Sequence, residues 1–334
     1  MILLALMLAA GAPHGRVLPP DLSQVDEEKL LRSGNKGALA AIADWNPTRV
    51  PVVLVHGIRG APGNLQPIFD KLRGPQRQLF AYAYDSWWHR RTSQSGDDLA
   101  EELRALGKDL GGGRDLVIVA HSMGGIVARR ALNNMVFGRQ KGAELYRRIR
   151  LVAIDTPWHG YYGPADSGAE GFFMGVVALF MPNALEDMRA RSAMFQGDPK
   201  GADPGQKRGL LNVVFPGNVE VDVIFAQGGT EAWDYTEDPL RPLVAKLVDY
   251  FKTERPIQAE PWVINHWRAL IQSTRHYAFS TRMEQLANQG QLNEGTARAA
   301  LLEHFPRYAG DHMGVLHDAK MLDWLATRVV EPLN

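Results

Sequence analysis

The 334-residue sequence contains no cysteine, no excess of charge of either sign and no long apolar run. Without a thiol the chain can hold no disulfide, no cysteine nucleophile and no cysteine-based metal site. Lys plus Arg and Asp plus Glu both number 37, so the formal net charge is zero. A neutral chain does not attract a polyanion as a whole, and we therefore expect no nucleic-acid partner. No run reaches the roughly 20 apolar residues that a membrane-spanning helix needs.

An apolar run begins the chain over residues 2–10 and is followed by Gly11 and Ala12. It has the character of a signal-peptide core before a small-residue cleavage site, although no basic segment precedes it. We interpret residues 1–12 as a signal peptide, which favours export to the periplasm or the medium over a cytoplasmic location. A frayed or docked N-terminal helix is the alternative. Residues 13–48 are expected to form a leader segment, with a helix near residues 26–32.

From residue 49 onward, short β-branched runs alternate with helical patterns. Strands are predicted over residues 51–55, 79–84, 116–119, 149–154 and 221–226, and helices over 64–72, 97–110 and 318–330 and after residue 122. This alternation implies parallel strands joined by right-handed crossovers. The sequence therefore predicts one α/β domain over residues 49–334, with a mostly parallel central sheet and helices on both faces.

Two stretches break the alternation and are interpreted as helical insertions. The first, at about 157–218, is predicted to be a cap that contains an apolar segment at 172–180 and a flexible loop at 196–209. The second spans about 235–304 and contains helical patterns at 243–251, 263–277 and 296–304. Neither the apolar segment at 172–180 nor the one at residues 2–10 is long enough to span a membrane.

The pattern around Ser122 joins a strand to a helix through a turn of small residues. A serine exposed at such a sharp turn needs very small neighbours two residues before and after it, and Ala120 and Gly124 occupy those positions. The helix N-terminus would present backbone N–H groups and a favourable dipole to negative charge. This is the G-x-S-x-G nucleophile elbow with alanine in the first position. The alternative is a serine that only caps a crossover helix.

Two motifs together resemble the lipase and esterase branch of the α/β-hydrolase superfamily. They are Val-Leu-Val-His-Gly-Ile over residues 53–58 and Ala-His-Ser-Met-Gly-Gly over 120–125, of which the second is similar to bacterial triacylglycerol lipases. Thr-Pro-Trp-His-Gly over 156–160 further resembles a group of serine esterases with a Thr-Pro-x-x-Gly segment after the next strand. The resemblance covers about residues 50–160 and returns at His312. It implies the α/β-hydrolase fold.

The resemblance also implies roles for particular residues. Ser122 would be the nucleophile, and the backbone N–H groups of Ile58 and Met123 would form the oxyanion hole. His312, just before the last helix, would be the general base, with His317 as the alternative. Three other histidines, each beside a motif glycine or serine, are interpreted as structural: His56, His121 and His159.

The acid that orients the base is expected just after the strand that ends near residue 226. In the family this position often reads Gly-x-x-Asp, and the sequence here reads Gly-Gly-Thr-Glu over 228–231. We rank Glu231 first and Asp234, one turn further on, second. Asp155 ranks third, because some lipases place their acid at the end of the preceding strand.

The resemblance implies a serine carboxylic-ester hydrolase, a lipase or esterase that acts through an acyl-enzyme without a metal or organic cofactor. Its expected partner is a small-molecule or lipid ester, with transient contact between the cap and a lipid surface. A phospholipase, thioesterase or acyltransferase on the same fold is one alternative, and a non-catalytic binding protein is another. The apolar segment at 172–180 suits an acyl-chain contact and equally suits a cap helix packed on the core.

Overall fold

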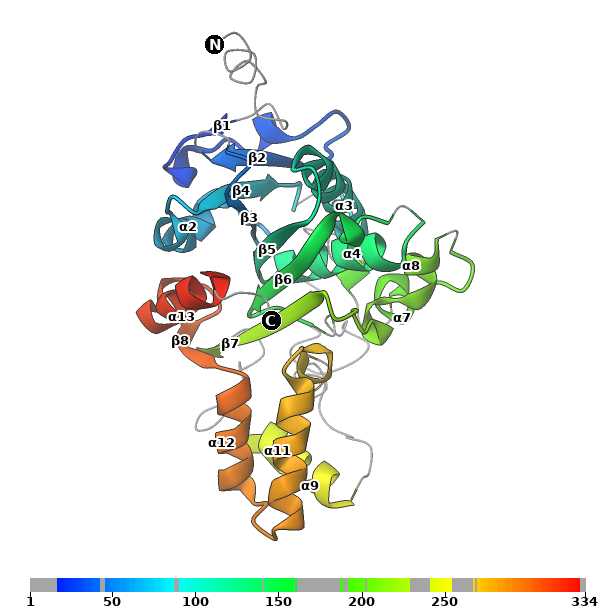
Figure 1. Cartoon of the computed structure of the whole chain (residues 1–334), viewed down its shortest axis with the longest axis vertical. Coiled ribbons are helices and arrows are strands. Elements are labelled where there is room, and N and C mark those ends of the chain that lie inside the picture. Colours follow the sequence, from blue (N-terminus) through cyan, green and yellow to red (C-terminus); the bar gives the residue numbers. More distant parts are fainter. Residues whose placement is uncertain are drawn as a thin grey trace.

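The computed structural model describes residues 17–42, 46–86, 90–139, 141–158, 160, 187–188, 192–201, 203–228, 241–253, 267 and 269–330. An eight-stranded sheet crosses this part of the chain (Figure 1). In spatial order its strands are β1 (Val17–Leu18), β2 (Ala38–Ile42), β4 (Arg77–Ala83), β3 (Val50–Val55), β5 (Arg114–His121), β6 (Tyr146–Ile154), β7 (Val219–Gly228) and β8 (Arg307–Asp311). Among these strands β2 and β4 pair antiparallel, and the other neighbours pair parallel. The predicted mostly parallel α/β fold is confirmed.

Helices cover both faces of the sheet, as the alternation of strands and helices predicts. On one face lie α3 (Thr92–Asp109) and α4 (Met123–Phe137), and on the other lie α2 (Gln66–Leu72) and α13 (Ala319–Val330) (Figure 1). Strand β3 shows why both faces need cover, because Val53 and Val55 pack into one buried cluster while Val52 and Leu54 pack into the other. A strand buried on both sides reads as a continuous apolar run.

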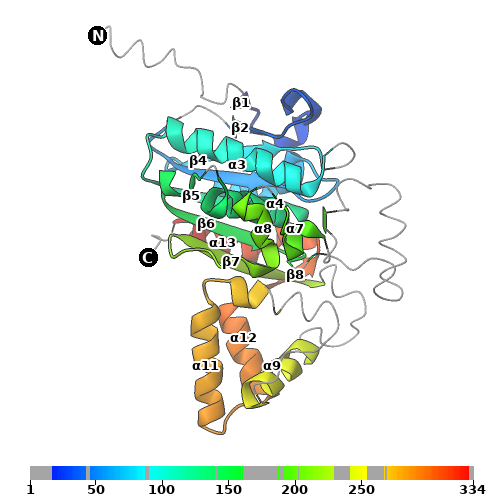
Figure 2. The same cartoon turned by 90° about the vertical axis from the view of Figure 1, so that its right-hand side faces the viewer.

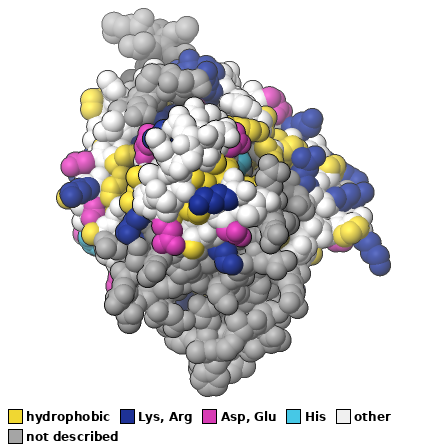
Figure 3. Space-filling view, turned by 90° about the horizontal axis from the view of Figure 1, so that it is seen from below, with side chains coloured by type: hydrophobic (Ala, Val, Ile, Leu, Met, Phe, Trp, Pro, Cys, Tyr) yellow, Lys and Arg dark blue, Asp and Glu magenta, His cyan; other side chains and the backbone are white. Residues whose placement is uncertain are grey.

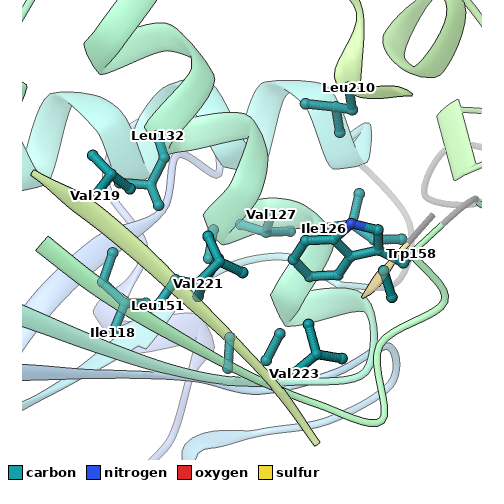
Figure 4. Packing of buried hydrophobic residues seen from close by; sticks show 14 of the residues in the cluster. Ile118, Ile126, Val127, Leu132, Leu151, Trp158, Leu210, Val219, Val221 and Val223 are labelled. Atoms are coloured by element: carbon teal, nitrogen blue, oxygen red, sulfur yellow. The ribbon is translucent and has the colours of Figure 1, made fainter. Parts of the chain in front are cut away.

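Packing against the sheet fixes α4, the helix that begins next to Ser122 (Figure 4). Aliphatic side chains from β5, β6 and β7 meet those of α4, and all of them are nearly or fully buried: Ile118, Ile126, Val127, Leu132, Leu151, Val219, Val221 and Val223. Each such side chain contributes about 1.5–3 kcal/mol on burial. The start of α4 is therefore held by the largest cluster of the described core.

The N-terminal segment belongs to the sheet, although the sequence places the start of the domain at residue 49. Strand β2 lies between β1 and β4, with Ala38 opposite Ala83 and Ala41 opposite Phe80. Its sequence, Ala-Leu-Ala-Ala-Ile, is rich in a residue that is depleted in strands, so the pattern does not predict it. The helix expected near residues 26–32 is a short 3-10 turn at Glu28–Leu30. The expected signal peptide at 1–12 lies outside the described residues.

The two insertions differ from their sequence-based descriptions in detail. Within the first lie α7 (Ala193–Gln196) and α8 (Pro204–Arg208). The second of these falls in the loop expected at 196–209, where Asp203 accepts a hydrogen bond from the Gly205 N–H at 2.8 Å and Asn133 of α4 donates to the Gly205 carbonyl at 2.8 Å. The apolar segment at 172–180 lies outside the described residues.

The second insertion contains α9 (Arg241–Thr253), α11 (His276–Asn288) and α12 (Glu294–His304). These helices pack together and extend away from the β7 and β8 edge of the sheet (Figure 1, Figure 2). Short 3-10 turns complete the described part: η1 (Leu22–Gln24), η2 (Glu28–Leu30), η3 (Pro62–Leu65), η4 (Ala143–Leu145), η5 (Leu210–Asn212) and η6 (Gly314–His317).

The surface matches the neutral composition. Basic and acidic side chains are both present on the described part of the face shown in Figure 3. Among the helices of the described residues, none has the length and apolar character that crossing a membrane requires.

Candidate active site

Ser122 occupies a strained turn between β5 and α4. Its backbone has φ 55° and ψ −131°, in a region that side-chain-bearing residues rarely adopt and that costs of order 1–3 kcal/mol. The turn is held from both sides, since the Ser122 N–H donates to the Ile154 carbonyl at 2.9 Å and the Gly125 N–H donates to the Ser122 carbonyl at 3.0 Å. The structure therefore shows the strand-to-helix turn that the small-residue pattern predicts.

The glycines around Ser122 permit close packing that a larger residue would prevent. A Cβ at Gly124 would overlap the His56 carbonyl oxygen and lie 2.5 Å from that of Val55, so the start of α4 rests directly on the end of β3. A Cβ at Gly57 would lie 3.2 Å from Ser122 Oγ, which places the glycine-rich turn after β3 beside the hydroxyl. The elbow and this turn thus form one compact unit.

A hydrogen-bonded pair of His312 and Asp155 lies at the carboxyl ends of the strands, where Ser122 also lies. His312 follows β8, Asp155 follows β6, and the His312 Nδ1 to Asp155 Oδ2 distance is 2.6 Å. The other oxygen, Asp155 Oδ1, accepts the Ala226 N–H at 3.2 Å. Burial alone would raise the pKa of Asp155, but the hydrogen bond and charge of His312 and the Ala226 N–H together lower it. An ionised aspartate on Nδ1–H leaves Nε2 of His312 as the proton acceptor.

His121 connects this pair to the elbow. Its Nε2 lies 2.8 Å from the His312 carbonyl oxygen, and the two rings lie 4.6 Å apart. Burial, followed by the charge of His312, lowers the pKa of His121 to about 4. A neutral imidazole with its proton on Nε2 donates to that carbonyl. Because His121 immediately precedes Ser122, this bond places the His312 turn next to the serine.

The segment after Asp155 is fixed to α4 by a buried arginine. Arg129 is fully buried, donates to the Trp158 carbonyl oxygen at 2.7 Å, and stacks its guanidinium 4.5 Å from the Trp158 ring centroid. It also donates to the Leu210 carbonyl oxygen and to Gln272 of the second insertion. Both insertions are thereby attached to the helix that starts at the elbow.

Met123 and Ile58 occupy the positions expected of oxyanion donors. Met123 is the first residue of α4, where backbone N–H groups have no partner within the helix. Ile58 follows Gly57 in the turn beside Ser122 and is partly buried against the core. An oxyanion hole at these positions would use backbone N–H groups, so neither side chain would be needed for it.

The structure brings together some of the predicted site residues and not others. Glu231 and Asp234, ranked first and second as the acid, lie outside the described residues. The third-ranked Asp155 makes the bond to His312, whereas the exposed His317 lies in η6. The decisive feature is the register of β5 and β6, which pairs His121 with Ile154 and so sets the next residues, Ser122 and Asp155, side by side. Within the described residues, no group of three or more His, Asp or Glu side chains could hold a metal ion.

The model of the Alpha/beta hydrolase family matches residues 52–325. The chain belongs to the alpha/beta hydrolase family. No curated protein matches it significantly.

The solved structures that this chain matches include enzymes of several kinds. The mature lipase BlEst2 of Bacillus licheniformis is 16% identical with a TM-score of 0.41, covering 90% of this chain and 99% of the lipase. In its propeptide form, the match covers 59% of this chain and 40% of the lipase chain, with 16% identity and a TM-score of 0.37. A carboxylesterase structure from Nitrososphaera gargenis is 14% identical, with a TM-score of 0.41 and coverage of 90% and 96%. A thioesterase domain from the curacin biosynthetic pathway is 14% identical, with a TM-score of 0.37 and coverage of 90% and 96%.

Proposed function

We propose that this alpha/beta hydrolase is a serine carboxylic-ester hydrolase, a lipase or esterase whose triad is Ser122, His312 and Asp155. The observation that carries the proposal is the 2.6 Å bond between His312 Nδ1 and Asp155 Oδ2, at the sheet edge where Ser122 occupies its strained turn. A serine that only caps a helix needs neither a partly buried histidine–aspartate pair nor a left-handed backbone.

In the proposed reaction Nε2 of His312 takes the proton of Ser122 Oγ while Oγ attacks the acyl carbon of the ester. The carbonyl oxygen becomes an oxyanion, which the N–H groups of Met123 and Ile58 stabilise. Loss of one such donor typically costs about 2.7–4 kcal/mol of transition-state stabilisation. His312 then gives its proton to the leaving alcohol, and Asp155 stabilises the imidazolium throughout. Water repeats the steps on the acyl-enzyme and releases the acid.

Asp155 is the acid of this proposal in place of Glu231 and Asp234. The Asp155 side chain is 10% exposed and already bonds Nδ1 of His312, so one oxygen is committed to the base. Its backbone has φ 43°, a second strained position at the same edge of the sheet as Ser122. Strain of this kind clusters at active sites, where the surrounding structure holds it in place.

The test is replacement of the nucleophile. Ser122→Ala should abolish hydrolysis of short p-nitrophenyl esters and covalent labelling by a fluorophosphonate probe, at an unchanged melting temperature. Ser33→Ala, at an exposed serine of the N-terminal segment, is the matched control and should be labelled like the wild type. Labelling that persists in Ser122→Ala, or a wild type that is not labelled, would overturn the proposal.

A further inference from the structure

A carboxylate from the N-terminal segment contacts the turn that carries Ile58. Glu27 Oε1 accepts the Tyr84 N–H at 2.9 Å and lies 2.5 Å from Nε2 of His56. The side chain of Glu27 is 17% exposed and that of His56 only 1% exposed. From the sequence His56 is interpreted as structural. That interpretation does not account for its contact with Glu27, which lies in a segment expected to precede the domain.

Both ring nitrogens of His56 face acceptor oxygens. Nε2 faces the Glu27 oxygen, which already accepts the Tyr84 N–H, and Nδ1 lies 2.9 Å from the Gly57 carbonyl oxygen. The carbonyl oxygen cannot donate, so Nδ1 of His56 carries a proton and donates to it, and one further proton lies between Nε2 and the Glu27 carboxyl group. The Tyr84 ring stacks on His56 at a centroid distance of 4.4 Å and holds the imidazole ring in this orientation. The Glu27 carboxyl group is therefore what allows His56 to keep a proton on Nδ1.

The Nδ1–H group of His56 fixes one peptide group of the turn. The Gly57 carbonyl oxygen accepts from Nδ1 of His56 and, at 3.2 Å, from the Gly60 N–H. In a planar trans peptide the N–H points opposite to the carbonyl, so holding the Gly57 carbonyl also fixes the direction of the Ile58 N–H. Gly57 lies against Ser122, and the fixed N–H therefore belongs to the peptide next to the hydroxyl.

We infer that Glu27 is a positioning residue for the oxyanion hole, which acts through His56 on the Gly57–Ile58 peptide. The inference rests on the proposed function, in which the Ile58 N–H donates a hydrogen bond to the oxyanion. Glutamine at position 27 would still accept the Tyr84 N–H but has no acidic proton to share. His56, with a single proton, would then place it on Nε2, toward the glutamine oxygen, and turn a lone pair of Nδ1 toward the Gly57 carbonyl. Repulsion between these two acceptors would shift the peptide.

The experiment compares Glu27→Gln with Glu28→Gln, the same change at the exposed neighbouring residue. We expect Glu27→Gln to lower kcat for p-nitrophenyl ester hydrolysis by roughly 10- to 100-fold, short of the loss of a whole donor. KM should change by less than about two-fold, and the affinity for a boronic acid that forms a tetrahedral adduct should fall in parallel with kcat. Glu28→Gln should behave like the wild type.

A second pair of variants tests whether Glu27 acts through His56. His56→Phe keeps a ring beside Tyr84 but cannot donate to Gly57, and it should lower kcat by a similar factor. Adding Glu27→Gln to His56→Phe should then change kcat by less than about two-fold, since coupled residues are not additive. This double variant buries no unpaired charge, and it keeps the test usable if Glu27→Gln folds poorly.

An unchanged kcat in Glu27→Gln, a rise in KM alone, or full additivity in the double variant would overturn the inference. These outcomes are distinct from failure of the proposed function. That failure would show as a wild type without fluorophosphonate labelling or as a labelled Ser122→Ala variant, whatever Glu27 does.

Discussion

His121→Gln should make the folded state less sensitive to acid. Burial and the neighbouring His312 lower the pKa of His121 to about 4, from 6.5 for an ordinary histidine. Between these values the unfolded chain binds a proton that the native protein does not, so the stability of the native protein falls as the pH decreases from about 7 toward 4. The full difference of the two pKa values corresponds to about 3 kcal/mol, of which about 2 kcal/mol is lost by pH 5. Glutamine has no such titration, and its side-chain amide can still donate to the His312 carbonyl.

The assay is urea unfolding followed by tryptophan fluorescence at pH 7.5 and pH 5.0, at one ionic strength. The free energy of unfolding of the wild type should decrease between these pH values by about 2 kcal/mol more than that of His121→Gln. His317→Gln, at an exposed histidine of η6, is the control and should keep the wild-type pH dependence. Equal pH dependence of the wild type and His121→Gln would refute the reasoning, because His121 would then titrate alike in the folded and unfolded states.

Two further predictions concern the acid and the elbow. Asp155→Asn should lower kcat about 10,000-fold at an unchanged melting temperature, because asparagine favours the wrong tautomer of the base. Glu231→Gln and Asp234→Asn should retain near-wild-type kcat, and a comparable loss in either would move the acid to that residue. Gly124→Ala should lower the free energy of unfolding by about 1–3 kcal/mol or more, because its Cβ overlaps carbonyl oxygens at the end of β3. Gly74→Ala, with no atom within 4 Å of the added Cβ, is the unfolding control.

The sequence predicts the central strands well and the sheet edges poorly. Strands β3, β5, β6 and β7 are rich in valine, isoleucine and leucine. Burial on both faces makes the pattern of β3 and β5 nearly continuous, whereas Glu220 and Asp222 interrupt that of β7. Strand β2 is mostly alanine, and β8 reads Arg-Tyr-Ala-Gly-Asp, so neither has the composition of a buried strand. Both strands form by pairing with neighbouring strands of the sheet. A local sequence pattern does not reveal pairing between segments that are far apart in the chain.

The candidate site likewise contains residues that the sequence predicts and residues that it does not. Ser122 is found from sequence because its turn requires small residues at fixed positions in one short stretch. Asp155 depends on the register of β5 and β6, which sets it beside Ser122 although 33 positions separate them in the printed sequence. Glu27 contacts His56 and Tyr84, which follow β3 and β4, from a segment that has no periodic pattern. The chemistry of the elbow is local, whereas its acid and its positioning residue come from the tertiary structure.

The strain at the site and the packing of the core are linked. Ser122 and Asp155 have positive φ at the ends of adjacent strands, and each position costs of order 1–3 kcal/mol. The same edge is tied to the rest of the molecule by α4, whose apolar face is buried against the sheet, and by the buried Arg129. Because interiors are close-packed, such a frame does not yield to a few kcal/mol of local strain. We therefore expect core changes beneath α4 to impair the site before they unfold the domain, since the strained backbone depends on the helix that they loosen.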